Sequence, residues 1–178
     1  MPTTIDACEL PANALLRRYL DEGAYADCYR VDVAGDVSHP EFVEAFYTTA
    51  VFKLERRLLA WFASRPSTDQ QARDLAHERR TTFAAWSVEA RVNGQLLMAD
   101  MHQRTRSWLM CVPAPGGAAA GTRLYFGSAV VPIGGARSGK PRMGFAFRAL
   151  LGFHKLYSRV LLRAAVTRLA MAAERAGR

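Results

Sequence analysis

The C-terminal stretch from Gly144 to about Met171 constrains the fold of this chain more than any other segment. An α-helix repeats every 3.6 residues, and at that period the stretch separates into two faces. The apolar face holds Leu150, His154, Tyr157, Leu161, Ala164 and Ala165, and the opposite face holds Arg148, Lys155, Arg159 and Arg163. The pattern predicts a long amphipathic helix whose wide apolar face another element must cover.

Strand-like sequence upstream can supply that cover. Residues Phe83 to Val92 alternate between apolar and polar side chains, and Asn93-Gly94 is typical of a two-residue hairpin turn, because both turn positions need positive φ. A two-residue turn there sets four pairs: Val92 with Gln95, Ala90 with Leu97, Val88 with Ala99, and Trp86 with Met101.

A second tight turn is predicted at Gln103 and Arg104. It starts a third strand and places Trp108, Met110 and Val112 on the same face as Met101, Ala99 and Leu97. We expect this shared face to point toward the C-terminal helix. A fourth strand, Thr122 to Ile133, is apolar on both sides, so its facing stays open.

The first half of the chain predicts a helix, a strand and a helix pair. Pro11 starts a short helix that Gly23 closes, and Tyr25 to Val33 alternates as a half-buried strand does. Ser38 and Glu41 form a capping box that opens a helix running to Pro66, and a more polar helix follows from Asp69 to about Arg79. Together the elements predict an α+β fold, an antiparallel sheet wrapped around the C-terminal helix.

The length of 178 residues fits one domain. We divide it into an N-terminal helical extension (1–24), a core (25–171) and a basic tail (172–178). Cys8, Cys28 and Cys111 are far apart and odd in number, which favours free thiols in a reducing compartment. The first residues hold neither a basic region nor an apolar run, so a cytoplasmic location is expected.

Gly134 to Lys140 matches the phosphate-loop pattern G-x-x-x-x-G-K. Pro141, however, stands where Ser or Thr would hold magnesium, and proline lacks the amide N–H that such a helix start directs at phosphate. The antiparallel meander also lacks the parallel βαβ unit of that motif. No nucleotide or other cofactor is therefore predicted.

Glu89, Asp100 and His102 are the acidic and imidazole groups closest to a possible metal or acid–base cluster. The strand alternation places all three opposite Trp86, Met101 and Trp108, on the side expected to face water. No metal site and no catalytic residue is assigned.

His154 and Tyr157 are polar groups on the apolar face of the long helix. Two interpretations stay open. If the sheet stands off from the helix, the gap forms a ligand site lined by Trp86, Met101, Trp108, Met110, His154 and Tyr157. The ligand would then be a small hydrophobic molecule, with His154 as a general acid or base in an enzymatic version. If the gap is filled, the same residues are core.

The net charge of +8 is concentrated at the C-terminus, where residues 137–178 hold ten Lys or Arg and one acidic residue, Glu174. Arg148, Lys155, Arg159 and Arg163 form a stripe on the polar helix face. It is either a solvated face or a weak contact for an anionic membrane surface or acidic partner. Nucleic acid is not expected, because no aromatic residues are interleaved to stack bases. The oligomeric state is left open.

The order of elements resembles the START-like helix-grip (SRPBCC) superfamily, with a strand, a helix pair, antiparallel strands and a long C-terminal helix. In addition, Phe126 to Ile133 (Phe-Gly-Ser-Ala-Val-Val-Pro-Ile) and Gly152 to Arg159 (Gly-Phe-His-Lys-Leu-Tyr-Ser-Arg) resemble the end of a family of uncharacterised bacterial proteins. The resemblance implies a cavity between sheet and helix that takes lipids, polyketides or aromatic molecules, and a cyclase or hydrolase activity in some members. It names no ligand.

Overall fold

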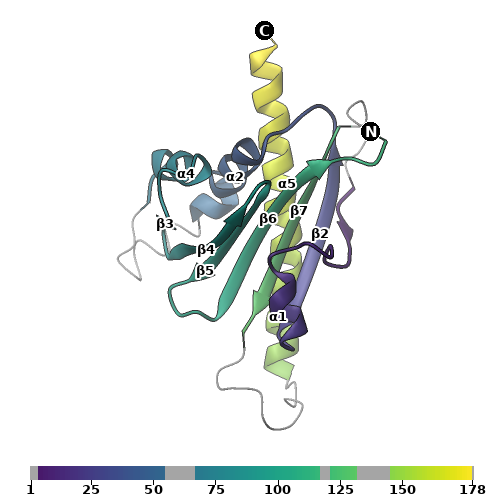
Figure 1. Cartoon of the computed structure of the whole chain (residues 1–178), viewed down its shortest axis with the longest axis vertical. Coiled ribbons are helices and arrows are strands. Elements are labelled where there is room, and N and C mark those ends of the chain that lie inside the picture. Colours follow the sequence, from purple (N-terminus) through teal and green to yellow (C-terminus); the bar gives the residue numbers. More distant parts are fainter. Residues whose placement is uncertain (1–3, 55–66, 117–120, 132–144, 178) are drawn as a thin grey trace.

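The computed structural model describes residues 4–54, 67–116, 121–131 and 145–177, without the side chains of residues 145–154. The strands are β1 Asp6–Ala7, β2 Tyr25–Val33, β3 Thr82–Phe83, β4 Trp86–Val92, β5 Gln95–Asp100, β6 Thr105–Pro113 and β7 Thr122–Val130. The helices are α1 Arg17–Asp21, α2 His39–Tyr47, α4 Asp69–Ala76 and α5 Phe145–Ala176. These elements form an α+β fold in which one helix, α5, runs along a seven-stranded antiparallel sheet (Figure 1).

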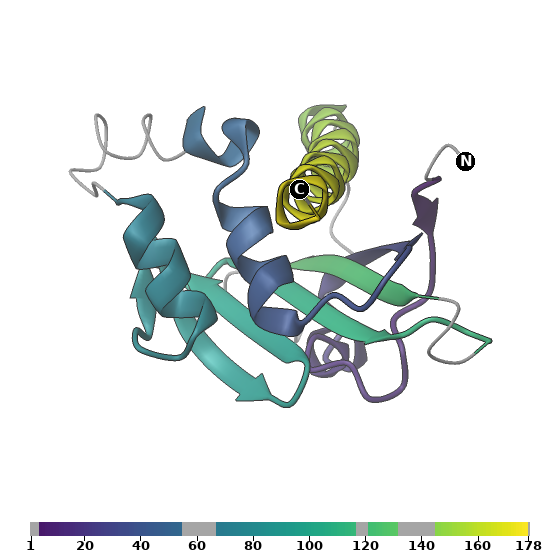
Figure 2. The ribbon, with the colours of Figure 1, turned by 90° about the horizontal axis from the view of Figure 1, so that it is seen from above.

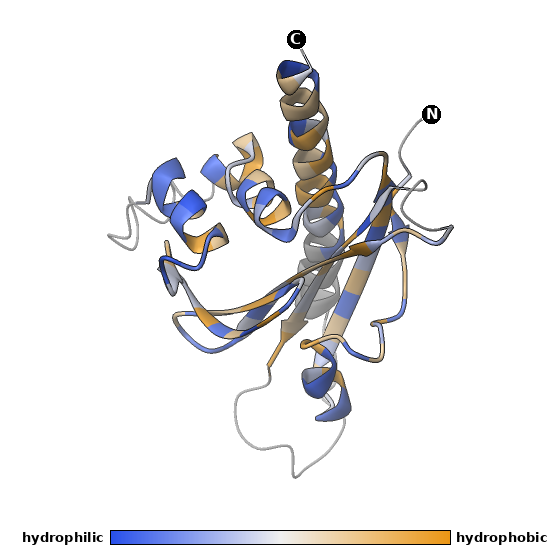
Figure 3. Cartoon of the chain, turned by 45° about the horizontal axis from the view of Figure 1, so that its top comes forward, coloured by the Kyte–Doolittle hydropathy of each residue, from blue (hydrophilic) through white to orange (hydrophobic). Residues whose placement is uncertain are grey.

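The sheet has the order β1-β2-β7-β6-β5-β4-β3, so the first long strand lies beside the last one. Helices α2, α4 and α5 lie on one side of the sheet, and α1 lies on the other (Figure 2). Hydrophobic residues mark the central strands, whereas α4 is mostly hydrophilic (Figure 3). The predicted strand Tyr25–Val33 and the capping box of Ser38 with Glu41 are both confirmed.

The helix-covered face holds the larger core. Its buried aromatic side chains are Tyr29, Phe42, Phe46, Tyr47, Phe52, Phe83 and Phe126. Phe46 contacts Phe126 of β7 with ring centroids 4.7 Å apart. Leu161 of α5 is buried in this core and Tyr157 packs against it, which confirms their predicted facing. The side chains of Leu150, His154 and Arg148 lie outside the described residues.

The opposite face is buried too, beneath the chain from Leu10 to Ala24. Its centre is Trp108, which is fully buried and lies directly across from Gly127 of β7. A Cβ on Gly127 would come within 3.0 Å of the Trp108 ring and 2.9 Å of a Leu16 methyl group. The glycine therefore lets the indole and the N-terminal segment approach the strand backbone.

A β-bulge at Glu89 changes the hairpin register. Val92 pairs with Gln95 and Ala90 with Leu97 as predicted, but Val88 pairs with Met98 and Trp86 with Asp100. The predicted pairs of Val88 with Ala99 and of Trp86 with Met101 are therefore wrong. The extra residue turns Trp86 and Val88 toward the helix side, while Ala90 packs on the other side.

The turn between β5 and β6 has four residues, Met101 to Arg104, rather than two. Asp100 organises it: Oδ1 accepts the amides of Arg104 (2.6 Å) and Thr105 (2.8 Å), and Oδ2 accepts the amide of His102 (3.2 Å). Burial acts to raise the pKa of Asp100, but these amide donors outweigh it and lower the pKa overall. The longer turn pairs Leu97 with Trp108 and preserves the shared face.

The helix predicted from the Ser38 capping box is interrupted. α2 ends at Tyr47 and helix resumes at Ala50, because two threonines bond to the backbone between them. Thr48 Oγ1 donates to the Glu44 carbonyl (2.6 Å), and Thr49 Oγ1 accepts the Phe52 amide (3.1 Å). The predicted continuation through residues 55–66 lies outside the described residues.

Two further predicted boundaries differ. α1 begins at Arg17 instead of Pro11, since residues 12–16 form turns. The more polar helix ends at Ala76, and Thr68 caps its start. The open question about the fourth strand is also answered: Leu124 and Phe126 of β7 face the helices, and Tyr125 faces the N-terminal segment.

Candidate functional site

The structure separates the residues expected to line a gap between helix and sheet. Trp86 and Tyr157 pack against the helix-side core, but Trp108 and Met110 lie in the core of the opposite face. Met101 lies in the turn after β5 and is 45% exposed. The predicted placement of Trp108, Met110 and Met101 is therefore wrong, because their shared face points away from α5. His154 belongs to the part of α5 whose side chains are not described.

Where α5 crosses the sheet, its described side chains pack as core. Ser158, Leu161, Leu162 and Ala165 are each at most 3% exposed. At this point the helix and the sheet therefore form a filled interface.

A groove lies between the C-terminal half of α5 and strands β1 and β2. Its volume is about 810 Å³, within the range of roughly 300–1,000 Å³ typical of small-molecule sites. The apolar lining comes from Val33, Ala34, Val37, Val166, Leu169, Ala170 and Ala173. The polar lining comes from Thr4, Asp6, Arg30, Asp32, Arg123 and Glu174.

The two arginines of the groove differ in their partners. Arg123 forms a two-pronged ion pair with Asp32, with Nε–Oδ1 2.6 Å and Nη2–Oδ2 2.7 Å. Hydrogen bonding to Arg123 lowers the pKa of Asp32. The Arg30 guanidinium makes no ion pair or side-chain hydrogen bond within the described part of the chain. Arg30 is therefore available for an anionic group of a ligand.

A smaller groove, about 460 Å³, lies on the other flank of α5, against α2. Asp36, Glu41 and Glu44 line one side, and Arg168 and Arg175 line the other. These opposite charges complement one another across the groove. The groove beside β2 is accordingly the better candidate, since it offers more apolar surface and an available arginine.

A polar row crosses the helix-side face next to the filled core. Asp27, Ser128 and Ser107 are directly paired across three strands. Ser128 Oγ donates to Asp27 Oδ1 (2.5 Å), and the Tyr47 hydroxyl lies 3.4 Å from Ser107 Oγ. Within the described residues, Asp27 Oδ2 and Ser158 Oγ have no hydrogen-bond partner.

Sequence reasoning missed this row, although a signal was present. Asp27 stands on the apolar phase of its strand, between Tyr25 and Tyr29, and a carboxylate in that position needs an explanation. Burial, followed by the Asp27 charge, raises the pKa of both tyrosines to about 12. The hydroxyls of Tyr25 and Tyr29 therefore stay protonated and can donate hydrogen bonds.

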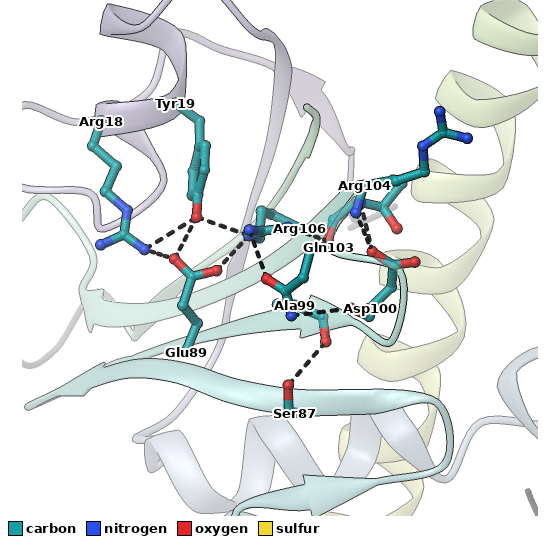
Figure 4. Close-up of polar contacts among 10 residues, drawn as sticks. Arg18, Tyr19, Ser87, Glu89, Ala99, Asp100, Gln103, Arg104 and Arg106 are labelled. Carbon is teal, nitrogen blue, oxygen red and sulfur yellow. Dashed lines mark hydrogen bonds and ion pairs between the residues drawn. The ribbon is translucent and has the colours of Figure 1, made fainter. Parts of the chain in front are cut away.

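On the opposite face, Glu89 joins α1 to the sheet (Figure 4). Its carboxylate contacts Arg18, the Tyr19 hydroxyl and Arg106, and Arg106 Nε also donates to the Tyr19 hydroxyl at 2.8 Å. Arg106 is only 6% exposed, so the charge is buried with its partner. The expectation that Glu89 faces water is wrong, because α1 covers it. Asp100 and His102 contact each other in the β5–β6 turn and not Glu89.

Comparisons with protein-family models, with curated proteins and with solved structures found no match to this chain. The helices within the described residues include none with both the length and the apolar character needed to cross a bilayer.

Proposed function

We propose that the groove between α5 and β2 binds a small hydrophobic molecule that carries an anionic group, such as a lipid, polyketide or aromatic acid. The observation that carries the proposal is the groove of about 810 Å³ itself, with apolar walls and the available Arg30 guanidinium. Apolar side chains of β2 and α5 remove the ligand's hydrocarbon part from water. Arg30 supplies a charge-assisted hydrogen bond that fixes its orientation.

The order of elements supports the further proposal of a helix-grip fold of the START-like superfamily. β2 lies beside β7, the meander continues through β6, β5 and β4, and α5 lies along the sheet. A ligand site between sheet and C-terminal helix is what that resemblance implies. The proposed groove lies between β2 and the C-terminal part of α5, beyond the residues of α5 that pack as core.

A ligand panel tests the proposal. Fatty acids and aromatic carboxylic acids are compared with their methyl esters by thermal shift and by titration with a fluorescent apolar dye. We expect the acids to raise the Tm of the parent protein and the esters to bind less well. Arg30→Gln should weaken binding of the acids roughly tenfold and leave the esters unchanged, because one charged hydrogen bond is lost.

The shape of the groove is tested separately with a filling variant. Ala170 is exposed and lines the groove, so Ala170→Trp fills it without disturbing the core. Thr167→Trp, at an exposed position outside the groove, is the matched control. Binding that survives Ala170→Trp, or a panel in which no compound stabilises the parent protein, contradicts the proposal.

A second function, contact with an anionic membrane surface, is favoured by the outer face of α5. Leu156 and Val160 are 63% and 40% exposed, and they alternate along the helix with the exposed Lys155 and Arg163. Arg159 is exposed too, but its guanidinium lies over the Tyr29 ring of β2, 5.3 Å from the ring centroid, so it does not point straight away from the sheet as predicted. Apolar and basic side chains on one helix face suit the boundary between anionic headgroups and acyl chains. Each basic residue adds roughly 1 kcal/mol at most, so binding would be weak and would fade with salt.

Co-sedimentation with phosphatidylcholine vesicles, with and without phosphatidylglycerol, tests this contact at low and high salt. The triple variant Lys155→Glu, Arg159→Glu, Arg163→Glu should lose binding to the anionic vesicles. A charge-matched triple variant at Arg17, Arg80 and Arg104 should keep most of it. Equal binding by both variants would mean that the stripe is a solvated face.

A further inference from the structure

Two thiols meet at the edge of the sheet. β1 pairs with β2 through Asp6 with Arg30 and Ala7 with Tyr29, and the Cys8 amide donates to the Cys28 carbonyl at 3.0 Å. Cys8 thus lies directly opposite Cys28, and their Sγ atoms are 3.4 Å apart. Both cysteines are free in the structure.

We propose that Cys8 and Cys28 are a peroxide-sensitive modification site that forms a reversible disulfide and locks the N-terminal strand onto the sheet. Opposed residues in a hydrogen-bonded antiparallel pair have Cα atoms about 5.5 Å apart, inside the disulfide range of about 4.4–6.8 Å. The sulfur atoms therefore reach bonding distance by small side-chain rotations, with no change of backbone register.

The surroundings assign different roles to the two thiols. Cys8 is partly exposed, whereas Cys28 is 4% exposed and packs in the N-terminal core. The hydrogen bond with Cys28 lowers the pKa of Cys8; burial opposes this shift and the Arg30 charge adds to it. Hydrogen bonding to Cys8, then burial, raises the pKa of Cys28. Cys8 is thus the thiol that meets the oxidant, and Cys28 resolves the product.

The reaction balances with a hydroperoxide as oxidant. The Cys8 thiolate attacks one peroxide oxygen, an S–O bond forms, the O–O bond breaks, and the leaving hydroxide takes up a proton as water. The Cys28 sulfur then attacks the Cys8 sulfenic acid. The S–S bond forms, the S–O bond breaks, and the Cys28 proton leaves with the hydroxide as a second water. The two thiols lose two electrons, and hydrogen peroxide is reduced to two waters.

The bond would act on two parts of the molecule. It closes a loop across a sequence separation of 20 residues that contains α1, so it fastens the N-terminal segment that covers Trp108. It also fastens β1, a strand of two residues whose Asp6 lines the groove. The thiol reaction itself does not depend on whether the groove binds a ligand.

Cys111 provides an internal control. Its Sγ donates to the Val37 carbonyl at 2.9 Å, and burial, followed by the charges of Asp36 and Glu41, raises its pKa to about 11. It is a partly buried thiol whose hydrogen-bond partner is a backbone carbonyl. We expect it to react far more slowly than Cys8.

The test treats the full chain with hydrogen peroxide under native conditions, then denatures and alkylates it for peptide mass spectrometry. We expect a linked Cys8–Cys28 peptide lighter by two hydrogens, an alkylated Cys111, and full reversal by dithiothreitol. Cys111→Ser should form the same bond, and Cys8→Ser should form none. A disulfide that includes Cys111, or oxidation of Cys8 to a sulfinic or sulfonic acid without a disulfide, would overturn the proposal.

Thermal unfolding gives a second measurement, and it needs no substitution at the buried Cys28. The oxidised parent protein should unfold on the order of 5–10 °C above the reduced protein, since the bond restricts the unfolded chain. Cys8→Ser, at a partly exposed position, should show equal Tm values with and without peroxide. An oxidised parent protein with an unchanged Tm would contradict the locking role.

Discussion

The two faces of the sheet are both buried, but different interactions hold their covers. On the helix side, α2, α4 and α5 bring rings and aliphatic side chains into one apolar core. On the other side, a mostly irregular chain covers Trp108 and is fixed by polar side chains. Gln95 Oε1 accepts the Leu15 amide (3.0 Å) and the Trp108 indole N–H (2.9 Å), and its Nε2 donates to the Asn13 carbonyl (3.0 Å).

The difference follows from backbone hydrogen bonding. A helix satisfies its own amides and carbonyls, so α5 needs only an apolar face to dock on the sheet. The segment before α1 has few internal partners, so the Gln95 side chain must satisfy its backbone, and Glu89 fastens α1 itself through Arg18 and Tyr19. The helix-side cover is therefore held by the apolar area that it buries, whereas the N-terminal cover is held by the hydrogen bonds of particular side chains.

The largest expected effect removes the centre of the N-terminal face. Trp108→Ala should cost about 3–5 kcal/mol in the free energy of unfolding, because a fully buried indole leaves a cavity. Phe46→Ala, at an equally buried position on the helix side, is the matched variant and should cost about as much. Urea unfolding measures both. A loss below about 1 kcal/mol for Trp108→Ala would mean that this face is not closed.

Gln95→Leu isolates the polar contribution to the N-terminal cover. It keeps the side-chain volume but leaves the Leu15 amide and the Trp108 indole N–H without their acceptor, which should cost about 3 kcal/mol. Gln70→Leu, at an exposed position of α4, should change stability by less than about 0.5 kcal/mol. If the two variants were equally stable, hydrogen bonds would not fasten this face.

Acid should weaken the helix side through His39. Burial, followed by the Arg91 charge, lowers the pKa of His39 from 6.5 to about 4. Between pH 6.5 and 4 the unfolded chain therefore binds a proton at His39 that the native protein does not bind. The free energy of unfolding is at its full value above pH 6.5 and falls as the pH drops toward 4. The loss should reach roughly 2–3 kcal/mol. Urea unfolding against pH measures it, and His39→Asn should flatten the slope; an unchanged slope would exclude His39 as its source.

The smallest effect tests the helix caps on the helix side. Ser38→Ala removes the acceptor for the Glu41 amide and should cost about 1 kcal/mol. Thr68→Ala removes the equivalent acceptor at the start of α4 and should cost a similar amount. Thermal unfolding resolves both losses. A cost near zero at both positions would place the stability of α2 and α4 entirely in their packing.

The sequence by itself determined the elements whose signals are local. The alternation of β2, the capping box at Ser38, the Asn93-Gly94 hairpin and the long C-terminal helix each depend on a few neighbouring residues. It also predicted that Leu97, Trp108 and Met110 share one face. In the candidate groove, however, no residue was predicted, because β1, β2 and α5 meet there from distant parts of the chain.

Only the tertiary structure decided which cover each face receives. Strand alternation has a period of two, so an apolar set on either face fits the same pattern, and the sequence does not say which set meets α5. The bulge at Glu89 and the four-residue turn after Asp100 then set the register through contacts with α1 and with turn amides. Packing assigned Trp108 to the N-terminal segment and Phe126 to the helices, since both sides of this sheet had to be removed from water.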